Sequence, residues 1–179
     1  MNSKGKNNPT PNLYLIGFMG TGKSSVGKII AQKTGLTFID SDQEIENQTG
    51  LSISKIFETQ GEQKFRELEK KFIQNGHPES GCLVSCGGGL PIPDGMIEIL
   101  KEKGFVFCLW ASVKTIYERT SGNNQRPLLQ TKNPKSEIKS LLEKREPKYL
   151  LADQIVNTEQ RSLVQVSDLI IRKYNESVY

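Results

Sequence analysis

Five short apolar runs alternate along the chain with longer stretches whose apolar residues recur at helical spacing. The runs predict strands at 13–17, 37–40, 82–86, 105–110 and 154–157. The intervening and following stretches predict helices at 23–35, 45–57 (interrupted near Gly50), 61–76, 93–103, 113–120, 136–151 and 163–174. Because strands that are apolar throughout must be covered on both faces, the alternation predicts an α/β fold, a parallel sheet of five strands with helices on both faces.

The composition is typical of one globular domain without a membrane or nucleic-acid partner. A chain of 179 residues can bury a sizeable core, and no apolar run approaches the roughly 20 residues of a membrane span. The net charge of +4, from 24 basic and 20 acidic residues, is too small to favour nucleic acid. Residues 1–11 resemble neither a secretory signal nor an organelle address, and we expect a disordered tail there.

The three cysteines, Cys82, Cys86 and Cys108, are an odd number in a chain without a signal peptide. This usage is typical of a reducing compartment, and we expect a cytoplasmic protein. With a single histidine, His77, the chain is poor in zinc ligands. We expect the cysteines to pack as small apolar residues.

The segment Gly17–Ser24 reads G-F-M-G-T-G-K-S and fits the phosphate-binding pattern G-x-x-x-x-G-K-[ST] between a predicted strand and a predicted helix. The glycines let backbone N–H groups point at an anion, and the helix adds its positive dipole end. Lys23 is expected at the β- and γ-phosphates and Ser24 at Mg²⁺. The predicted triphosphate-binding residues are Gly20, Thr21, Gly22, Lys23, Ser24 and Ser25.

Two carboxylates, Asp40 and Asp42, stand at the end of the second predicted strand, and ligands of such sheets bind beyond the carboxyl ends of the strands. Residues two apart in extended chain share a face, so the pair could hold hydrated Mg²⁺ or accept hydrogen bonds from a hydroxylated substrate. The alternative is that one of them only caps the helix that begins near Gln43.

Two arginines lie on or beside apolar helical stripes. Arg145 stands in the middle of the stripe Ile138, Leu141, Leu142 and Tyr149, where a guanidinium needs an anion. That anion could be a ligand or the partner in an internal salt bridge. Arg66 stands at the edge of its stripe and could equally be a solvated surface residue.

Glycines and arginines also mark the remaining loops. Gly87, Gly88 and Gly89 follow the third strand and would let backbone approach a ligand, or form a flexible turn. No acidic residue closes that strand, so the usual second acidic Mg²⁺ ligand is missing. The loop 121–135, bracketed by Arg119 and Arg126, reads as a closing lid or as a merely solvated loop. Together these features favour a phosphoryl-transfer enzyme acting on a small hydroxy acid.

From about Asn12 to Tyr174 the chain resembles the shikimate kinase family. The resemblance rests on six motifs in order: G-F-M-G-T-G-K-S, D-S-D-x-x-I-E at 40–46, G-E-x-x-F-R at 61–66, the triple glycine, R-P-L-L at 126 and R-x-P-x-Y at 145. It implies a P-loop kinase of the nucleoside monophosphate kinase type, with a lid. It further implies transfer of the ATP γ-phosphate to the 3-hydroxyl of shikimate, in the aromatic amino acid pathway.

The resemblance also implies roles for single residues. Asp42 would hold the ring hydroxyls, while Arg66 and Arg145 would bind the carboxylate beside the triple-glycine backbone. Asp40 would support Mg²⁺ through water. Arg126 would reach the phosphates from the lid, Arg119 would lie against adenine, and Asn157 and Thr158 would contact adenine. The residues expected to take part in catalysis are Lys23, Asp42 and Arg126.

We expect residues 12–179 to form a single kinase domain, and a monomer. Its core would comprise about 12–40, 77–119 and 150–175, with a substrate-binding region at about 41–76 and a lid at about 120–135. One departure from the family is Ser85-Cys86 before the triple glycine, where the family commonly has threonine. We expect Cys86 to be a weaker hydrogen-bond partner than that hydroxyl, and Ser85 to point to the other face.

Other readings share part of this evidence. A gluconate-type kinase would have the same phosphate loop and differ in its acceptor site. A GTPase switch is disfavoured because no N-K-x-D motif occurs. A non-catalytic binding protein of the same family is disfavoured by the intact Lys23, Ser24 and Asp42. A nucleic-acid kinase would need a larger basic surface.

Overall fold

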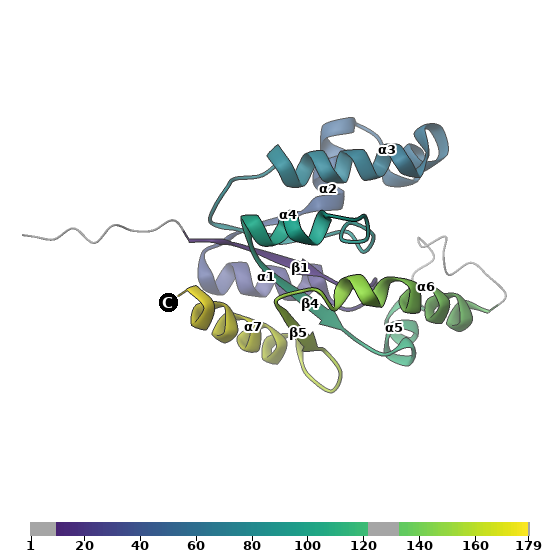
Figure 1. Ribbon diagram of the computed structural model, residues 1–179. Coiled ribbons are helices and arrows are strands. Elements are labelled where there is room, and N and C mark those ends of the chain that lie inside the picture. Colours follow the sequence, from purple (N-terminus) through teal and green to yellow (C-terminus); the bar gives the residue numbers. More distant parts are fainter. Residues whose placement is uncertain (1–9, 122–132, 179) are drawn as a thin grey trace, which may run out of the picture.

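A computed structural model describes residues 10–121 and 133–178. Five strands form one sheet in the order β2-β3-β1-β4-β5, and all four neighbouring pairs are parallel (Figure 1). The strands are β1 Asn12–Ile16, β2 Thr37–Asp40, β3 Cys82–Ser85, β4 Gly104–Trp110 and β5 Gln154–Asn157. The α/β fold class predicted from the sequence is confirmed.

Seven helices are present in the described part of the chain. They are α1 Lys23–Thr34, α2 Ser41–Thr49, α3 Ile53–Asn75, α4 Met96–Lys103, α5 Val113–Thr120, α6 Pro134–Tyr149 and α7 Leu163–Val178. Within the described residues, no helix is long and apolar enough to span a membrane.

The sheet separates two apolar cores. Leu13 and Leu15 of β1 pack on the face covered by α1 and α7, with Ile30 and Ile170 among their neighbours. Tyr14 and Ile16, which alternate with them, pack on the opposite face with residues of α2 to α6. Since successive side chains of a strand point to opposite faces, a strand buried on both sides is mostly apolar, and β1 reads Leu-Tyr-Leu-Ile after Asn12.

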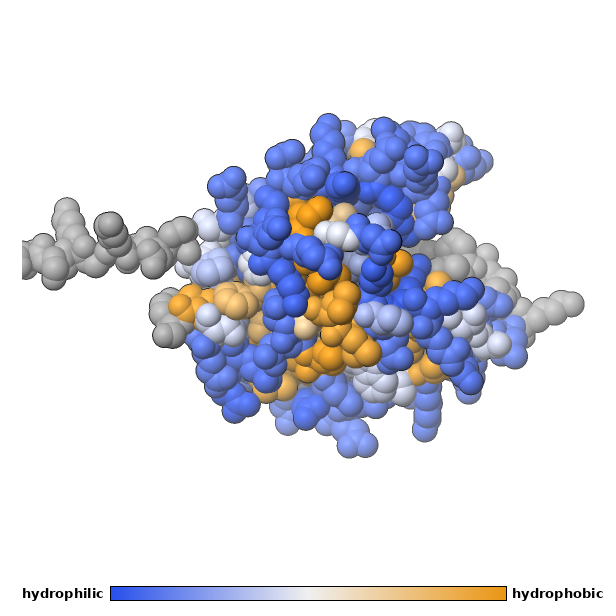
Figure 2. Space-filling view, in the orientation of Figure 1, coloured by the Kyte–Doolittle hydropathy of each residue, from blue (hydrophilic) through white to orange (hydrophobic). Residues whose placement is uncertain are grey.

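The space-filling view shows one face of the molecule. It is mostly hydrophilic, with hydrophobic residues gathered over β4 and β5 (Figure 2). The exposed large hydrophobic side chains include Leu150, Leu151 and Ile155, in β5 and in the turn that precedes it. All three cysteines are buried and free.

Several helix boundaries differ from those predicted. The helix predicted at 45–57 is two helices: α2 begins at Ser41 because the Asp40 side chain caps it, and α3 begins at Ile53 after its cap, Ser52. α3 continues through a non-helical Gly61 (φ 82°) into the helix predicted at 61–76. α4 begins at Met96 rather than Pro93, since residues 91–95 form turns. α6 begins at Pro134, capped by Asn133, and the lid predicted at 120–135 falls mostly on residues 122–132, outside the described part.

Candidate active site

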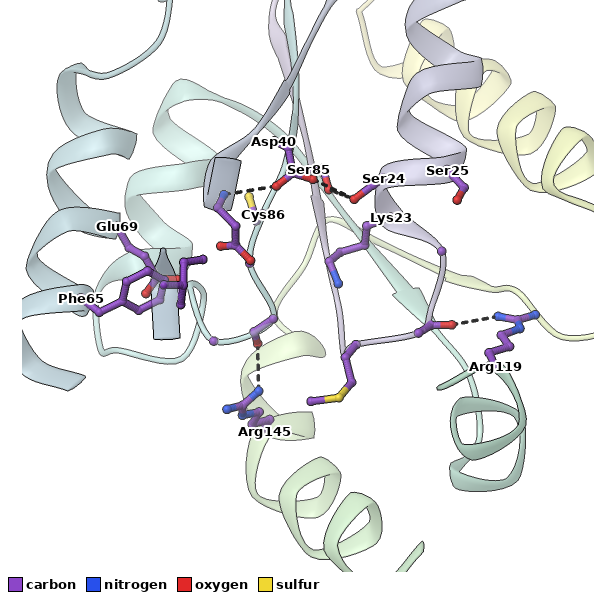
Figure 3. A pocket seen from close by; sticks show the side chains of 18 of the residues that line it. Lys23, Ser24, Ser25, Asp40, Phe65, Glu69, Ser85, Cys86, Arg119 and Arg145 are labelled. Carbon is purple, nitrogen blue, oxygen red and sulfur yellow. Dashed lines mark hydrogen bonds between the residues drawn. The ribbon is translucent and has the colours of Figure 1, made fainter. Parts of the chain in front are cut away.

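A cavity of about 930 Å³ opens at the carboxyl edge of the sheet (Figure 3). Most of the site residues predicted from the sequence line it: Gly20, Gly22, Lys23, Ser24, Ser25, Asp40, Asp42, Arg66, Gly87, Gly88, Gly89, Arg119 and Arg145. Three others, Thr21, Asn157 and Thr158, do not line it, and Arg126 lies outside the described residues. The fold thus brings six separate segments to one cavity.

The phosphate loop closes on its own backbone. Gly22 is the N-cap of α1 with φ 96°, a conformation that favours glycine. The Lys23 ammonium donates to the carbonyls of Gly17 and Phe18 at 2.9 and 3.0 Å. Thr21 is buried, and its hydroxyl donates to the Phe18 carbonyl at 2.8 Å, so Thr21 braces the loop rather than facing the cavity. The loop therefore leaves the first N–H groups of α1 facing the cavity, where an anion is favoured.

Three side-chain oxygens cluster beside the phosphate loop. The Ser24 hydroxyl donates to Asp40 Oδ2 at 2.8 Å and lies 3.1 Å from the Ser85 hydroxyl (Figure 3). Asp40 and Ser85 are paired in register across β2 and β3. Hard oxygen donors of this kind suit Mg²⁺, which takes one or two protein ligands when phosphates supply others.

Ser85 and Cys86 lie on opposite faces, as expected, but the expectation that Ser85 points away from the Ser24 and Asp40 oxygens was wrong. Ser85 shares the strand face of Leu83, which is covered by α1, and the N-terminal turn of α1 carries Ser24. Cys86 is buried with the opposite core, and burial raises the pKa of its thiol. The hydroxyl beside the Ser24 and Asp40 oxygens is therefore that of Ser85, and the departure at Cys86 does not remove it.

The two aspartates have different partners. Asp40 Oδ1 accepts from the backbone N–H of Asp42 at 3.2 Å, so the capping residue is Asp40. Asp42 Oδ1 is buried and has no hydrogen-bond partner among the residues described. Burial raises the pKa of Asp42 and the charge of Asp40 adds to this, while Lys23 opposes it. A buried carboxylate oxygen without a partner is costly, so it marks a place where a ligand donor would be favourable.

Glu69 is a site residue that the sequence reasoning missed. It lines the cavity at 1% exposure, and its Oε2 accepts from Arg66 Nη1 at 2.6 Å. Its Oε1 is buried without a partner in the described part. Burial raises the pKa of Glu69 to about 7 against the opposing effect of Arg66. The available signal was its spacing: Glu69 stands four residues after Phe65 and three before Phe72, on the buried stripe of α3.

Arg66 is not a solvated surface residue. Its side chain is 21% exposed and forms ion pairs with Glu62 at 2.8 Å and Glu69 at 2.6 Å. A Cβ added to Gly89 would overlap the Arg66 guanidinium, so a side chain at this position would displace the end of the arginine. The guanidinium therefore lies directly against the triple-glycine turn.

Arg145 approaches the same turn from α6. Its Nη1 donates to the Gly88 carbonyl at 3.4 Å, and its guanidinium stands 5.8 Å from the ring centroid of Phe18. Across residues 10–121 and 133–178, no carboxylate forms an ion pair with Arg145, so the internal salt bridge considered above is not found there. Arg145 and Arg66 thus flank the consecutive residues Gly88 and Gly89.

On the other side of the phosphate loop, Arg119 joins two segments. Its guanidinium donates to the hydroxyl and carbonyl of Thr158 at 2.9 and 3.0 Å, and to the Gly20 carbonyl at 3.5 Å. Arg161 was not predicted, but it lines the cavity and donates to the Asn157 carbonyl at 2.8 Å. Arg119 and Arg161 therefore place two cations beyond the phosphate loop, away from Arg66 and Arg145.

Comparisons with known proteins agree on one family. The family model described as shikimate kinase matches residues 19–175. The shikimate kinase of Thermodesulfovibrio yellowstonii is 45% identical over 163 residues, 91% of this chain and 94% of that protein. That of Persephonella marina is 44% identical over 89% of this chain and 96% of its own.

Solved structures give the same result. A shikimate kinase from Acinetobacter baumannii in complex with shikimate has a TM-score of 0.87 at 35% identity, with 94% of each chain covered. The shikimate kinase of Aquifex aeolicus has a TM-score of 0.78 at 32% identity, covering 93% of this chain and 98% of its own. A gluconokinase from Sinorhizobium meliloti, at 17% identity and a TM-score of 0.62, shares the fold alone. The chain belongs to the shikimate kinase family.

Proposed function

We propose that this protein transfers the γ-phosphate of ATP to the 3-hydroxyl of shikimate, giving ADP and shikimate 3-phosphate. One observation carries the proposal most directly. A single cavity joins the phosphate loop to a pocket wall with two arginines and the unpartnered carboxylate oxygen of Asp42. An acceptor with a carboxylate and several hydroxyls complements that wall.

The acceptor side combines two kinds of recognition. Arg66 and Arg145 would bind the shikimate carboxylate, because guanidinium groups match carboxylate geometry with paired N–H donors. Asp42 would accept hydrogen bonds from the ring hydroxyls through its free oxygen. The glycines at 87–89 leave room for the ring next to the backbone. An acceptor without the carboxylate would leave the arginines unmatched, and one without hydroxyls would leave Asp42 unmatched.

The nucleotide side holds the phosphates. The residues at 20–25 would bind them through backbone N–H groups, Lys23 and hydroxyls, as P-loops do. Lys23 would exchange its bonds to the Gly17 and Phe18 carbonyls for phosphate oxygens. Arg119 and the segment around Asn157 and Thr158 would lie on the adenine side. Arg126 would reach the phosphates from the lid, a role that rests on the resemblance.

The oxygens of Ser24, Asp40 and Ser85 would hold Mg²⁺, directly or through water. Mg²⁺ held there would supply positive charge against the negative charge that develops on the phosphates during transfer. The oxygen cluster fits this role because its donors are hard. Ser24 also directly follows Lys23, which would bind the phosphates.

The residues of this chain would act mostly by positioning the acceptor hydroxyl and the phosphates. The 3-hydroxyl oxygen forms a bond to the γ-phosphorus as the bond from that phosphorus to the β-phosphate bridge breaks, and ADP leaves. Asp42 would take the hydroxyl proton, since its raised pKa makes it a better base than an ordinary aspartate. A loose phosphoryl transition state needs little covalent help, so orientation and charge neutralisation supply most of the acceleration.

The product's structure tests the reaction directly. The protein would be incubated with Mg-ATP and shikimate, and the product analysed by phosphorus-coupled proton NMR. Coupling at the proton on carbon 3 is expected. Coupling at another ring position would require a different orientation of the acceptor between Asp42 and the arginines.

A further inference from the structure

The Gly88 carbonyl accepts two hydrogen bonds from α6, and they differ in length. The Tyr149 hydroxyl donates at 2.6 Å, whereas Arg145 Nη1 donates at 3.4 Å (the Arg145 contact is drawn in Figure 3). The short bond is near the optimum for a hydroxyl donor and the long one is near the limit of a hydrogen bond. The carbonyl is therefore satisfied by the tyrosine, and its contact with the arginine is weak.

The Tyr149 hydroxyl acts as a donor throughout the neutral pH range. The side chain is 1% exposed, and burial raises its pKa to about 12. The Arg145 guanidinium opposes that rise, which places its charge beside the hydroxyl. Both side chains thus meet at one carbonyl of the triple-glycine turn.

We propose that Tyr149 is a positioning residue for the acceptor site, which satisfies the Gly88 carbonyl and so keeps Arg145 available for the acceptor's carboxylate. The inference rests on the proposed function. Without the hydroxyl, the partly buried carbonyl would have Arg145 as its remaining side-chain donor, and the guanidinium would move onto it. A guanidinium engaged by a backbone carbonyl binds an incoming carboxylate less well, because binding must first break that contact.

Other contacts hold this part of α6 without the hydroxyl. The Trp110 indole donates to Glu146 at 3.2 Å, and Lys148 forms an ion pair with Asp94 at 2.5 Å. Glu146 and Lys148 flank Pro147 on the last turn of α6. Replacement of Tyr149 by phenylalanine keeps the buried ring and both anchors, so the change is confined to the hydroxyl.

The chain offers a matched control on the opposite face of the sheet. Tyr174 of α7 is also buried, at 4% exposure, and its hydroxyl also donates to a backbone carbonyl, that of Pro11. It belongs to the core beneath α1 and α7 and does not line the cavity. Tyr149→Phe and Tyr174→Phe therefore remove the same chemical group from comparable environments.

The test is steady-state kinetics of the wild type and both variants, with thermal melts of all three. For Tyr149→Phe we expect the KM for shikimate to rise about tenfold, the scale of one hydrogen bond. The kcat and the KM for ATP should stay within about twofold. Tyr174→Phe should lower the melting temperature by a similar amount and leave the KM for shikimate unchanged.

A second readout asks whether the hydroxyl acts through Arg145. In an Arg145→Ala background, Tyr149→Phe should change kcat/KM for shikimate by less than about twofold, since the group it protects is gone. An unchanged KM in Tyr149→Phe, or an equal rise in both tyrosine variants, would overturn the inference. A wild type that binds ATP but does not phosphorylate shikimate would overturn the proposed function itself, and this inference with it.

Discussion

Glu69 and Arg66 form an ion pair of 2.6 Å on the cavity wall, and the second oxygen of Glu69 is buried without a partner in the described chain. Asp42, whose Oδ1 is also unpartnered, raises the pKa of Glu69 further by its charge. Two carboxyl groups with a buried, unpartnered oxygen therefore lie together on the acceptor side of the cavity. We expect this relationship to make the stability of the protein depend on pH.

The first prediction concerns stability and pH. Glu69 has a pKa of about 7 in the folded protein against an ordinary value of 4.5. Because the folded state holds the proton more tightly, this contribution to stability is complete below about pH 4.5 and is lost as pH rises through about 7. Thermal melts of wild type should fall across this window more steeply than those of Glu69→Gln.

Glu67→Gln is the control, since Glu67 is on the same helix with an exposed side chain that pairs with Lys64. Its melting temperature should follow the wild type at every pH. Equal pH slopes for Glu69→Gln and wild type would show that Glu69 is ionised throughout the range.

A second prediction separates the two arginines. Arg145→Ala should raise the KM for shikimate by roughly 10- to 100-fold, the value of a charged hydrogen bond, with little loss of stability. Arg66→Ala should raise the KM similarly but also destabilise the fold more than Arg145→Ala does, because it leaves Glu69 buried without its cation. Kinetics and urea unfolding of both variants measure the difference. Equal stability losses would contradict the assigned partners.

The third prediction concerns the oxygens of Ser24, Asp40 and Ser85 that we propose hold Mg²⁺. Ser85→Ala should raise the Mg²⁺ concentration needed for half-maximal activity, because the Ser85 hydroxyl lies 3.1 Å from that of Ser24. Cys86→Ser changes the adjacent residue on the opposite face and should leave the Mg²⁺ requirement unchanged. The hydroxyl buried by Cys86→Ser should instead lower the free energy of unfolding by about 1–3 kcal/mol. A shifted Mg²⁺ requirement in Cys86→Ser alone would reverse the assignment of the two faces.

The fourth prediction concerns Arg126, which lies outside the described residues. Arg126→Ala should lower kcat about a hundredfold or more and change shikimate binding little, since an arginine that clamps transferring phosphate acts in the transition state. The kcat and the shikimate dissociation constant measure this separately. An unchanged kcat would remove Arg126 from the catalytic set.

Much of the fold follows from local pattern. All five strands were predicted to within one residue at either end, because a buried parallel strand is a continuous apolar run. The helix predicted from 136 begins at Pro134. Asn133-Pro134 is a typical cap followed by a first-turn proline, but the polar residues around it favoured a loop. The start of α2 depended on which aspartate caps, a choice that the sequence leaves open.

Less of the site than of the fold could be predicted from the sequence. The phosphate loop and Arg145 have local signals, a fixed motif and a charge on an apolar stripe. Glu69 is also a charged residue on the buried, mostly apolar stripe of its helix, and the same reasoning could have identified it. The faces of Ser85 and Cys86 depend on which helix covers each side of β3, and the bond from Tyr149 to Gly88 spans 61 residues. Such contacts depend on tertiary packing, which neither propensity nor spacing encodes.

Release of ADP from Mg-ATP in the presence of shikimate, gluconate or no acceptor tests the central claim most directly. Turnover that requires shikimate, with gluconate giving no more than the rate without acceptor, is the result predicted by the arginine pair and Asp42. Turnover with gluconate and not with shikimate would leave the phosphate loop in place but contradict the acceptor site. Tight ATP binding with no turnover in any arm would contradict catalysis itself.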